Sequence, residues 1–385
     1  MKPQYRAVAG LLAFQLSTAA LADVLPWSGH DTGPETTAER SLWTEAVDFD
    51  RAMARAGKLN SDPQLTFYLQ NIMDRLYPDF VGNFHVHAVN AQEINAFALP
   101  NGSVYINTGL LARFENEAQL ATVMAHEGAH FLYRHSYQQN EKAKSTSVFG
   151  LVVGMLGVPL IGDLIAVSSM FGYSREHERE ADKIGYERLV AAGYDPHEST
   201  KTFEHLLAEI KASDIKEPFF FASHPKLEER IESFKELSKD ARSGKLGKEE
   251  FINATATLRL ASFEADLAAY RHKQVILVLA NPKRRLEYPP EASYYLGEAY
   301  RQRNADGDKE KAEREYQIAI EGAPQFAPPY RALGLLCYRK HDIGRAEPLF
   351  RRYLELAPSA PDRDYIEAYL AQITSPAPAN PGASP

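Results

Sequence analysis

The amino-acid sequence predicts a mainly α-helical protein with a small β-sheet, followed in its last third by an α-solenoid. Three observations lead to this fold class. Apolar residues recur at helical spacing over most of the chain, whereas the alternation typical of strands is confined to residues 84–107. A pattern of paired helices is repeated after residue 290. The length of 385 residues allows two or about three domains.

The first 22 residues have the composition of a secretory signal peptide. Lys2 and Arg6 precede an apolar run, Ala7 to Leu16, and Ala20-Leu21-Ala22 forms a small-residue cleavage site. We therefore predict export, cleavage after Ala22 and a loose lead-in over residues 23–41. The alternative is a buried N-terminal helix.

Charge and cysteine content limit the cellular setting and the partners. Removing residues 1–22 takes away Lys2 and Arg6 but no acidic residue, so the formal net charge changes by −2, from −8 to −10. Such an acidic protein has no electrostatic basis for binding nucleic acid. Cys337 is the sole cysteine, so the chain can form no internal disulfide. An exported chain without disulfides is consistent with the bacterial periplasm.

The predicted sheet comes from residues 84–107. Phe84 to Val89 alternates as a strand and places His85 and His87 on one face. This histidine pair either marks a half-exposed face, which we favour, or binds a metal. Pro100-Asn101-Gly102 separates two apolar runs and predicts a hairpin. The edge of its first strand is expected to pair with an extended peptide through Asn95, Ala96, Phe97 and Ala98.

The segment His126-Glu127-Gly128-Ala129-His130 has the spacing of the H-E-x-x-H zinc motif. On a helix, His126 and His130 lie one turn apart on the same face, so two imidazoles can hold one Zn²⁺. Glu127 lies beside the first ligand, where it can act as a general base. The helix is otherwise almost wholly apolar, and unpartnered ionisable groups are costly to bury. The alternative is a chance pattern in which both histidines are hydrogen-bonded in the core.

Residues 148–170 form a long apolar stretch after this helix. Its length raises the question of a membrane span. Several glycines, Pro159 and Asp163 favour two short helices instead, and hence a helical hairpin that covers the site as a lid. A segment that touches the membrane peripherally is the alternative.

A third metal ligand has to come from outside the motif, because a catalytic zinc commonly has three protein ligands and one open position. The stretch from Ser174 to Asp182 begins a helix on which Glu178 and Asp182 lie one turn apart. We predict that Glu178 is the third ligand. Asp182 would then accept the free N–H of a zinc-bound imidazole. The alternative for this stretch is a solvated charged face.

His224 precedes Pro225 and the last helix of this domain, and so lies at a helix entrance. Three roles are open for His224: a structural residue, a fourth zinc ligand that keeps the enzyme latent, or a hydrogen-bond donor to the oxyanion of the reaction. Arg175 is a second candidate for the oxyanion role. We favour the latent form. The polar stretch 238–247 predicts a domain boundary, so the first domain spans residues 42–240.

Residues 250–373 follow the tetratricopeptide pattern. Two copies are clear, around Leu296-Gly297 and Leu333-Gly334, and residues 255–282 form a degenerate pair. Because an array of so few repeats is rarely stable alone, we expect it to pack against the preceding domain. Residues 374–385 form a Pro/Ala-rich tail that we expect to be disordered.

These motifs together resemble the zinc metallopeptidase family that includes the HtpX heat-shock protease and the CAAX prenyl protease. The resemblance rests on H-E-x-x-H, on Glu178 to Asp182 after Ser174-Arg175, and on the segment NAFALPNGSVYINTGLL. It covers roughly residues 42–237. It implies a zincin-like metalloprotease domain with one Zn²⁺ per chain.

The family pattern also implies roles for individual residues. His126, His130 and Glu178 would be the zinc ligands, with Glu180 as the competing ligand. Glu127 would be the general base.

Outside this domain the chain departs from the membrane-embedded members of the family. A signal peptide and a repeat array give a layout similar to that of the periplasmic beta-barrel assembly-enhancing proteases. This layout implies cleavage of unfolded or misassembled envelope proteins, with the repeats docking partners such as the outer-membrane protein assembly machinery. The alternatives are a latent protease that acts mainly as a chaperone or adaptor, and a membrane-associated quality-control protease.

Overall fold

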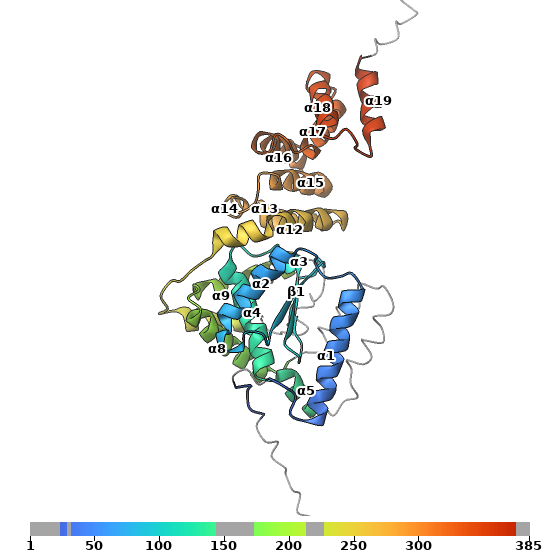
Figure 1. Ribbon diagram of the computed structural model, residues 1–385. Helices are drawn as coiled ribbons and strands as arrows, with labels where there is room; N and C mark the ends of the chain where they lie inside the picture. The colour runs from blue at the N-terminus through green and yellow to red at the C-terminus, as the bar shows by residue number, and fades with distance from the viewer. Residues whose placement is uncertain (1–23, 29–31, 144–172, 213–226, 375–385) are drawn as a thin grey trace, which may run out of the picture.

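The computed structural model describes residues 24–28, 32–143, 173–212 and 227–374 (Figure 1). The predictions for the signal peptide, for the lid at 148–170, for His224 and for the tail after residue 374 lie outside the described residues.

The first part of the chain holds a small sheet among helices (Figure 1). Its elements before the H-E-x-x-H motif are α1 (Thr37–Arg55), α2 (Pro63–Leu76), η1 (Pro78–Phe80), β1 (His85–Val89), β2 (Ala96–Ala98), β3 (Ser103–Asn107) and α3 (Thr108–Leu111). The motif helix and the helices that follow are α4 (Glu117–Leu132), α5 (His135–Ala143), α8 (Arg175–Ala191), α9 (His197–Ala212) and α11 (Leu227–Ser238).

The three strands are ordered β1-β3-β2, with β1 parallel and β2 antiparallel to β3. The predicted hairpin is confirmed, and its turn requires a glycine: Gly102 has φ +85°, and a Cβ there would lie 2.1 Å from the carbonyl oxygen of Asn83. The favoured interpretation of the β1 histidines also holds. His85 is exposed and His87 lies against the ring of Tyr105, with centroids 4.9 Å apart.

The sheet lies between two helical layers. On one face, Phe97 and Tyr105 pack against Phe49 of α1. On the other face, Ala98 and Val104 share a core with α2 and α4. This arrangement places β2 directly beside the motif helix.

α4 runs through the centre of this domain, and all of its residues are buried. The helix begins after Asn116, whose side-chain oxygen accepts a hydrogen bond from the Gln119 N–H at 3.0 Å and so caps the helix. α8 packs closely against α4 at Gly185, where a Cβ would lie only 3.0 Å from the backbone nitrogen of His126. The small residue thus lets α8 bring its side chains up to the motif.

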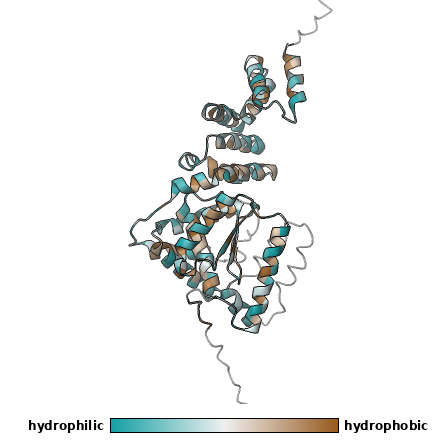
Figure 2. Ribbon diagram, in the orientation of Figure 1, coloured by the Kyte–Doolittle hydropathy of each residue, from teal (hydrophilic) through white to brown (hydrophobic). Residues whose placement is uncertain are grey.

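The last third is a stack of helices (Figure 1). They are α12 (Lys248–Ala268), α13 (His272–Leu279), α14 (Pro282–Arg285), α15 (Ala292–Arg303), α16 (Asp308–Gly322), α17 (Pro328–Arg339), α18 (Ile343–Leu356) and α19 (Arg363–Thr374). Each of the longer helices carries both hydrophilic and hydrophobic residues (Figure 2).

The two clear sequence copies are hairpins with matching contacts. In α15, Gly297 lies against the Tyr316 ring of α16, and in α17, Gly334 lies against the Phe350 ring of α18. A Cβ at either glycine would lie within 2.8 Å of that ring, so both hairpins need the same close approach. Cys337 of α17 is buried in the hydrophobic core of the second pair.

α12 joins the stack to the first domain. Its Phe251 belongs to the same hydrophobic core as α4, and Arg113 after α3 binds Asp266 of α12 at 2.6 Å. Arg259 of α12 is fully buried and donates to the carbonyl of Phe114 at 3.2 Å. The helix stack therefore packs against the first domain through α12, as expected. In the part of the chain that the structure describes, we find no helix long and apolar enough to cross a membrane.

Candidate metal centre

Three of the predicted ligands come together. α4 supplies His126 and His130 from consecutive turns, and α8 supplies Glu178; all three side chains are buried and offer ligand atoms within 4.8 Å of one another. The Nε2 atoms of the two histidines are 3.0 Å apart, and the Glu178 carboxylate lies 3.3 Å from one and 3.6 Å from the other.

These spacings are close to those around a zinc ion, with the two carboxylate distances inside its range and the distance between the histidines slightly shorter. Tetrahedral zinc with bonds of about 2.0–2.2 Å sets its ligand atoms about 3.3–3.6 Å apart. Two imidazole nitrogens and one carboxylate oxygen are also a donor set that zinc prefers. His85 and His87 of β1 are in no such group of the described residues.

The two histidines are held in the form that binds metal. Burial, followed by the charge of Arg230, lowers the pKa of His126. Burial, followed by the charge of His126, holds the pKa of His130 well below its ordinary value. Both imidazoles are therefore neutral at neutral pH, as ligand binding requires.

Asp182 lies where the sequence predicts it. Its Oδ1 is 3.0 Å from Nδ1 of His126, so the carboxylate can accept the N–H that the ligand ring does not use for metal. Burial alone would raise the pKa of Asp182, but Arg230 and His126 hold it below its ordinary value. Asp182 is thus an anion at neutral pH and selects the tautomer of His126 with a bare Nε2.

Sequence reasoning missed Arg230 of α11. Its guanidinium donates to Asp182 at 2.6 Å and lies 3.4 Å from Glu178, while stacking over the Phe203 ring at 4.2 Å. The signal that could have found it is a charge on an apolar face, because Arg230 falls between Leu227 and Phe234 at core spacing.

Glu127 faces the edge of the sheet. The Ala98 N–H of β2 donates to Glu127 Oε2 at 3.1 Å. The backbone of Asn95 and Leu99 bonds to β3 instead, so the backbone of Ala96 and Ala98 is directed toward the motif helix. The predicted strand edge, Asn95 to Ala98, therefore borders the metal centre, with all four residues buried.

Glu180 does not join the ligand atoms. It is on α8, two residues after Glu178, with a half-exposed side chain that lies 3.1 Å from Nε2 of His135. The structure thus places Glu178, rather than the competing Glu180, at the metal centre.

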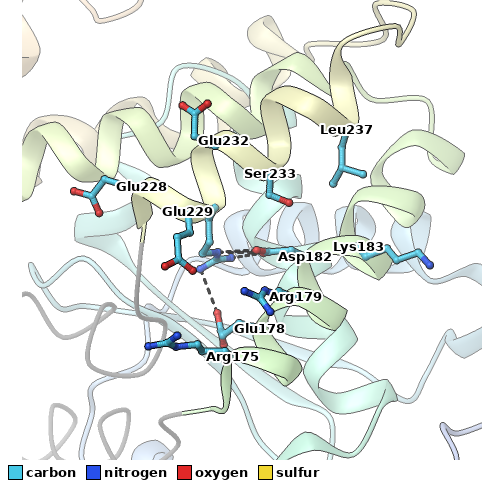
Figure 3. A pocket seen from close by; sticks show the side chains of 11 residues that line it. Arg175, Glu178, Arg179, Asp182, Lys183, Glu228, Glu229, Glu232, Ser233 and Leu237 are labelled. Atoms are coloured by element: carbon cyan, nitrogen blue, oxygen red, sulfur yellow. Dashed lines mark hydrogen bonds and ion pairs between the residues drawn. The ribbon is translucent and has the colours of Figure 1, made fainter.

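A groove of about 870 Å³ opens beside Glu178 and Asp182, between α8 and α11 (Figure 3). Around Glu178, Asp182 and Arg230, the rest of its lining differs in charge between the two helices. α8 contributes cations, and α11 contributes carboxylates: Arg175, Arg179, Lys183, Glu228, Glu229 and Glu232. Arg175 lies on this groove, and its predicted part in oxyanion binding stays a prediction.

Comparison with known proteins gives the site its family. Residues 62–238 match the model of peptidase family M48. The beta-barrel assembly-enhancing protease of Escherichia coli (strain K12) is 30% identical over 226 residues, which are 54% of this chain and 46% of that protein. The mitochondrial metalloendopeptidase OMA1 of Schizosaccharomyces pombe is 30% identical over 216 residues, covering 51% and 63% of the two chains. OMA1 of Arabidopsis thaliana is 36% identical over 125 residues, covering 32% and 26%.

The chain spans about half the length of the bacterial relatives. The matched segment includes the motif helix, β2 and the helices that carry Glu178, Asp182 and Arg230. Residues 62–238 are therefore a peptidase domain of family M48, and the three candidate metal ligands lie within it.

Proposed function

We propose that this chain is an exported zinc endopeptidase that cleaves unfolded or misassembled proteins of the bacterial envelope. The observation that carries the proposal is the juxtaposition of Glu127 and the β2 edge, joined at Ala98. An extended peptide that pairs with this edge would lie across Glu127 and the ligand atoms. Pairing with this edge needs an extended segment whose backbone groups are free, which an unfolded chain offers along its whole length, so the geometry favours unfolded segments as substrates.

The chain's own residues account for binding and proton transfer. His126, His130 and Glu178 would hold the zinc ion, which supplies Lewis-acid polarisation of the scissile carbonyl. Glu127 takes the proton of the attacking water on its carboxylate and passes it to the amine that leaves. The backbone of Ala96 and Ala98, which does not bond to β3, would hold the substrate backbone by hydrogen bonds once the Ala98 N–H exchanges Glu127 for the substrate.

The test is Glu127→Gln in the full chain. This variant should keep its zinc, because Glu127 is not among the three ligands, and should cleave casein about 100- to 10,000-fold more slowly because the general base is lost. Zinc content and turnover are measured together on both proteins. Unchanged cleavage, or full activity of the metal-free wild type, would reject the proposal.

The envelope setting rests on the relatives named as beta-barrel assembly-enhancing proteases and on the composition of residues 1–22. Export is tested by fractionating cells that express the full chain. Recovery of the uncleaved form in the cytoplasm would contradict it.

We further propose that the helix stack is a tetratricopeptide array that docks these substrates, or the machinery that assembles them. Its matching hairpins support the repeat assignment. The stack also carries a hollow of about 270 Å³ lined by aromatic and acidic side chains: Glu264, Tyr294, Tyr295, Glu298 and Phe326.

Glu264→Lys should weaken binding of a denatured outer-membrane protein, whereas Asp306→Lys, an exposed control on the α15–α16 loop, should not. Equal binding by both variants would count against docking at this hollow.

A further inference from the structure

The second ligand histidine has a different partner from the first. His126 faces Asp182 directly, at 3.0 Å. His130 instead places its Nδ1 2.9 Å from Nδ1 of His135, the first residue of α5. His135 in turn places its Nε2 3.1 Å from Oε2 of Glu180 on α8. A chain of two hydrogen bonds thus leads from a ligand ring to a carboxylate near the surface.

The direction of these two bonds follows from the last member. A carboxylate only accepts, so Nε2 of His135 must carry the proton that is shared with Glu180. A neutral His135 then has a bare Nδ1, which can only accept. The proton between the two rings therefore belongs to Nδ1 of His130. That leaves Nε2 of His130 bare, and Nε2 is the atom that faces His126 and Glu178.

The packing holds both rings in this orientation. His135 is fully buried, and the ring of His177 stacks on it at 4.4 Å with an interplanar angle of 13°. The Tyr173 ring stacks on His130 at 3.8 Å and 14°. A buried ring that is stacked in this way cannot turn away from its partner without leaving a void in the core.

We propose that His135 and Glu180 are positioning residues that set the tautomer and orientation of His130 for zinc. The inference rests on the proposed metal site and extends it. Each ligand histidine then has its own carboxylate, in direct contact for His126 and through a second histidine for His130. Glu180, which resembles a ligand in the sequence, acts on the metal only through His135.

The experiment measures zinc affinity rather than cleavage. The full chain is stripped of metal, and its dissociation constant for Zn²⁺ is determined by competition with a chromophoric chelator. His135→Ala should weaken binding about 10- to 100-fold, as expected for the loss of a hydrogen-bonded partner of a ligand. Glu180→Gln should weaken it less, because the amide oxygen can still accept. Glu187→Gln, an exposed carboxylate of the same helix, is the matched control and should change nothing.

Two further variants separate positioning from general damage. His135→Asn keeps an oxygen close to the position of Nδ1, so it should restore most of the affinity that His135→Ala loses. Glu180→Gln should have no added effect in the His135→Ala background, because its route to the metal is already broken.

The outcomes distinguish the positioning role of His135 and Glu180 from the metal site itself. If the wild type binds no zinc, the proposed function fails. If the wild type binds zinc, and His135→Ala and Glu180→Gln both bind it as tightly as the wild type does, only the positioning role of His135 and Glu180 is overturned. It is also overturned if Glu180→Gln abolishes binding with or without His135, since Glu180 would then be a ligand. Should His135→Ala fail to fold, Glu180→Gln and His135→Asn still decide the question.

Discussion

The two ends of α4 both bury ionisable side chains, but they do so for different purposes. At the first residue, the carboxylate of Glu117 accepts hydrogen bonds from Tyr68 at 2.8 Å, from Arg75 at 2.7 Å and from Tyr194 at 2.7 Å, with Lys245 at 3.3 Å. Here donors surround one acceptor. Three turns further on, His126, His130 and Glu178 direct acceptor atoms at one point.

The difference shows that burial and charge alone do not mark a functional site. The Glu117 cluster is satisfied by the protein itself, and the helix N-terminus adds a favourable dipole. Acceptors that converge on one point are instead stabilised by a cation. The direction of the polar atoms, rather than their number, separates the structural cluster from the catalytic one.

The largest expected effect is at the metal end. Glu178→Ala should weaken zinc binding by more than about 1,000-fold, or about 4 kcal/mol, because one of three ligands is lost. Folding of the metal-free chain should change little. Zinc analysis after gel filtration and thermal unfolding of the metal-free protein measure the two effects. Zinc retained in Glu178→Ala but lost in Glu180→Ala would move the ligand to Glu180.

The opposite result is expected at the other end of the helix. Glu117→Ala should lower the free energy of unfolding by about 3 kcal/mol, because it leaves the hydroxyls of the buried Tyr194 and the half-buried Tyr68 without their acceptor. Protein that remains folded should still bind zinc with wild-type affinity. Urea unfolding and chelator competition check this pair. A loss of zinc affinity in folded Glu117→Ala would show that the two clusters are coupled.

Asp182→Asn should fall between these cases. Zinc affinity should drop about 10- to 100-fold, since the amide supports the His126 tautomer less well than the carboxylate does. The buried Arg230 also loses its closest anion, so some stability should be lost too. Asp74→Asn on α2 is a distant control. An unchanged dissociation constant in Asp182→Asn would reject its part in orienting His126.

The smallest expected effect is on how the free energy of unfolding depends on pH, which should differ between the wild type and Glu117→Gln. Burial raises the pKa of Glu117, but hydrogen bonds from Tyr194, Tyr68 and Arg75 outweigh it and bring the pKa below its ordinary value of 4.5. The unfolded chain therefore takes up this proton first as the pH falls. The contribution of the Glu117 carboxylate to the free energy of unfolding is complete above pH 4.5. It is lost as the pH falls from there through the pKa that Glu117 has in the folded protein.

This window can be measured by urea unfolding of the metal-free protein at a series of pH values. The slope from this one group is at most about 1.4 kcal/mol per pH unit. It should be absent from Glu117→Gln, which has no proton to take up. Parallel curves for the two proteins would contradict the assignment.

Local pattern was enough to predict much of the site. The motif helix, the turn at Gly102 and the α8 pair of Glu178 and Asp182 each depend on residues at most a few positions apart. Helical and strand periodicity determine which side chains share a face, and a zinc site needs specific residue types at such spacings. His126, Glu127, His130 and Glu178 could therefore be named before their contacts were known.

Only the tertiary structure decided which residues support those ligands. Arg230 is 104 residues from His126, and Glu180 is 45 residues from His135, so no local spacing links either pair. The sequence suggested Glu180 as a ligand because an acidic residue beside Glu178 has the same chemistry. The approach of α8 to α4 at Gly185 places Glu178 at the metal centre and Glu180 against His135. Helix packing, which sequence spacing does not encode, determines which of two chemically equivalent carboxylates faces the metal.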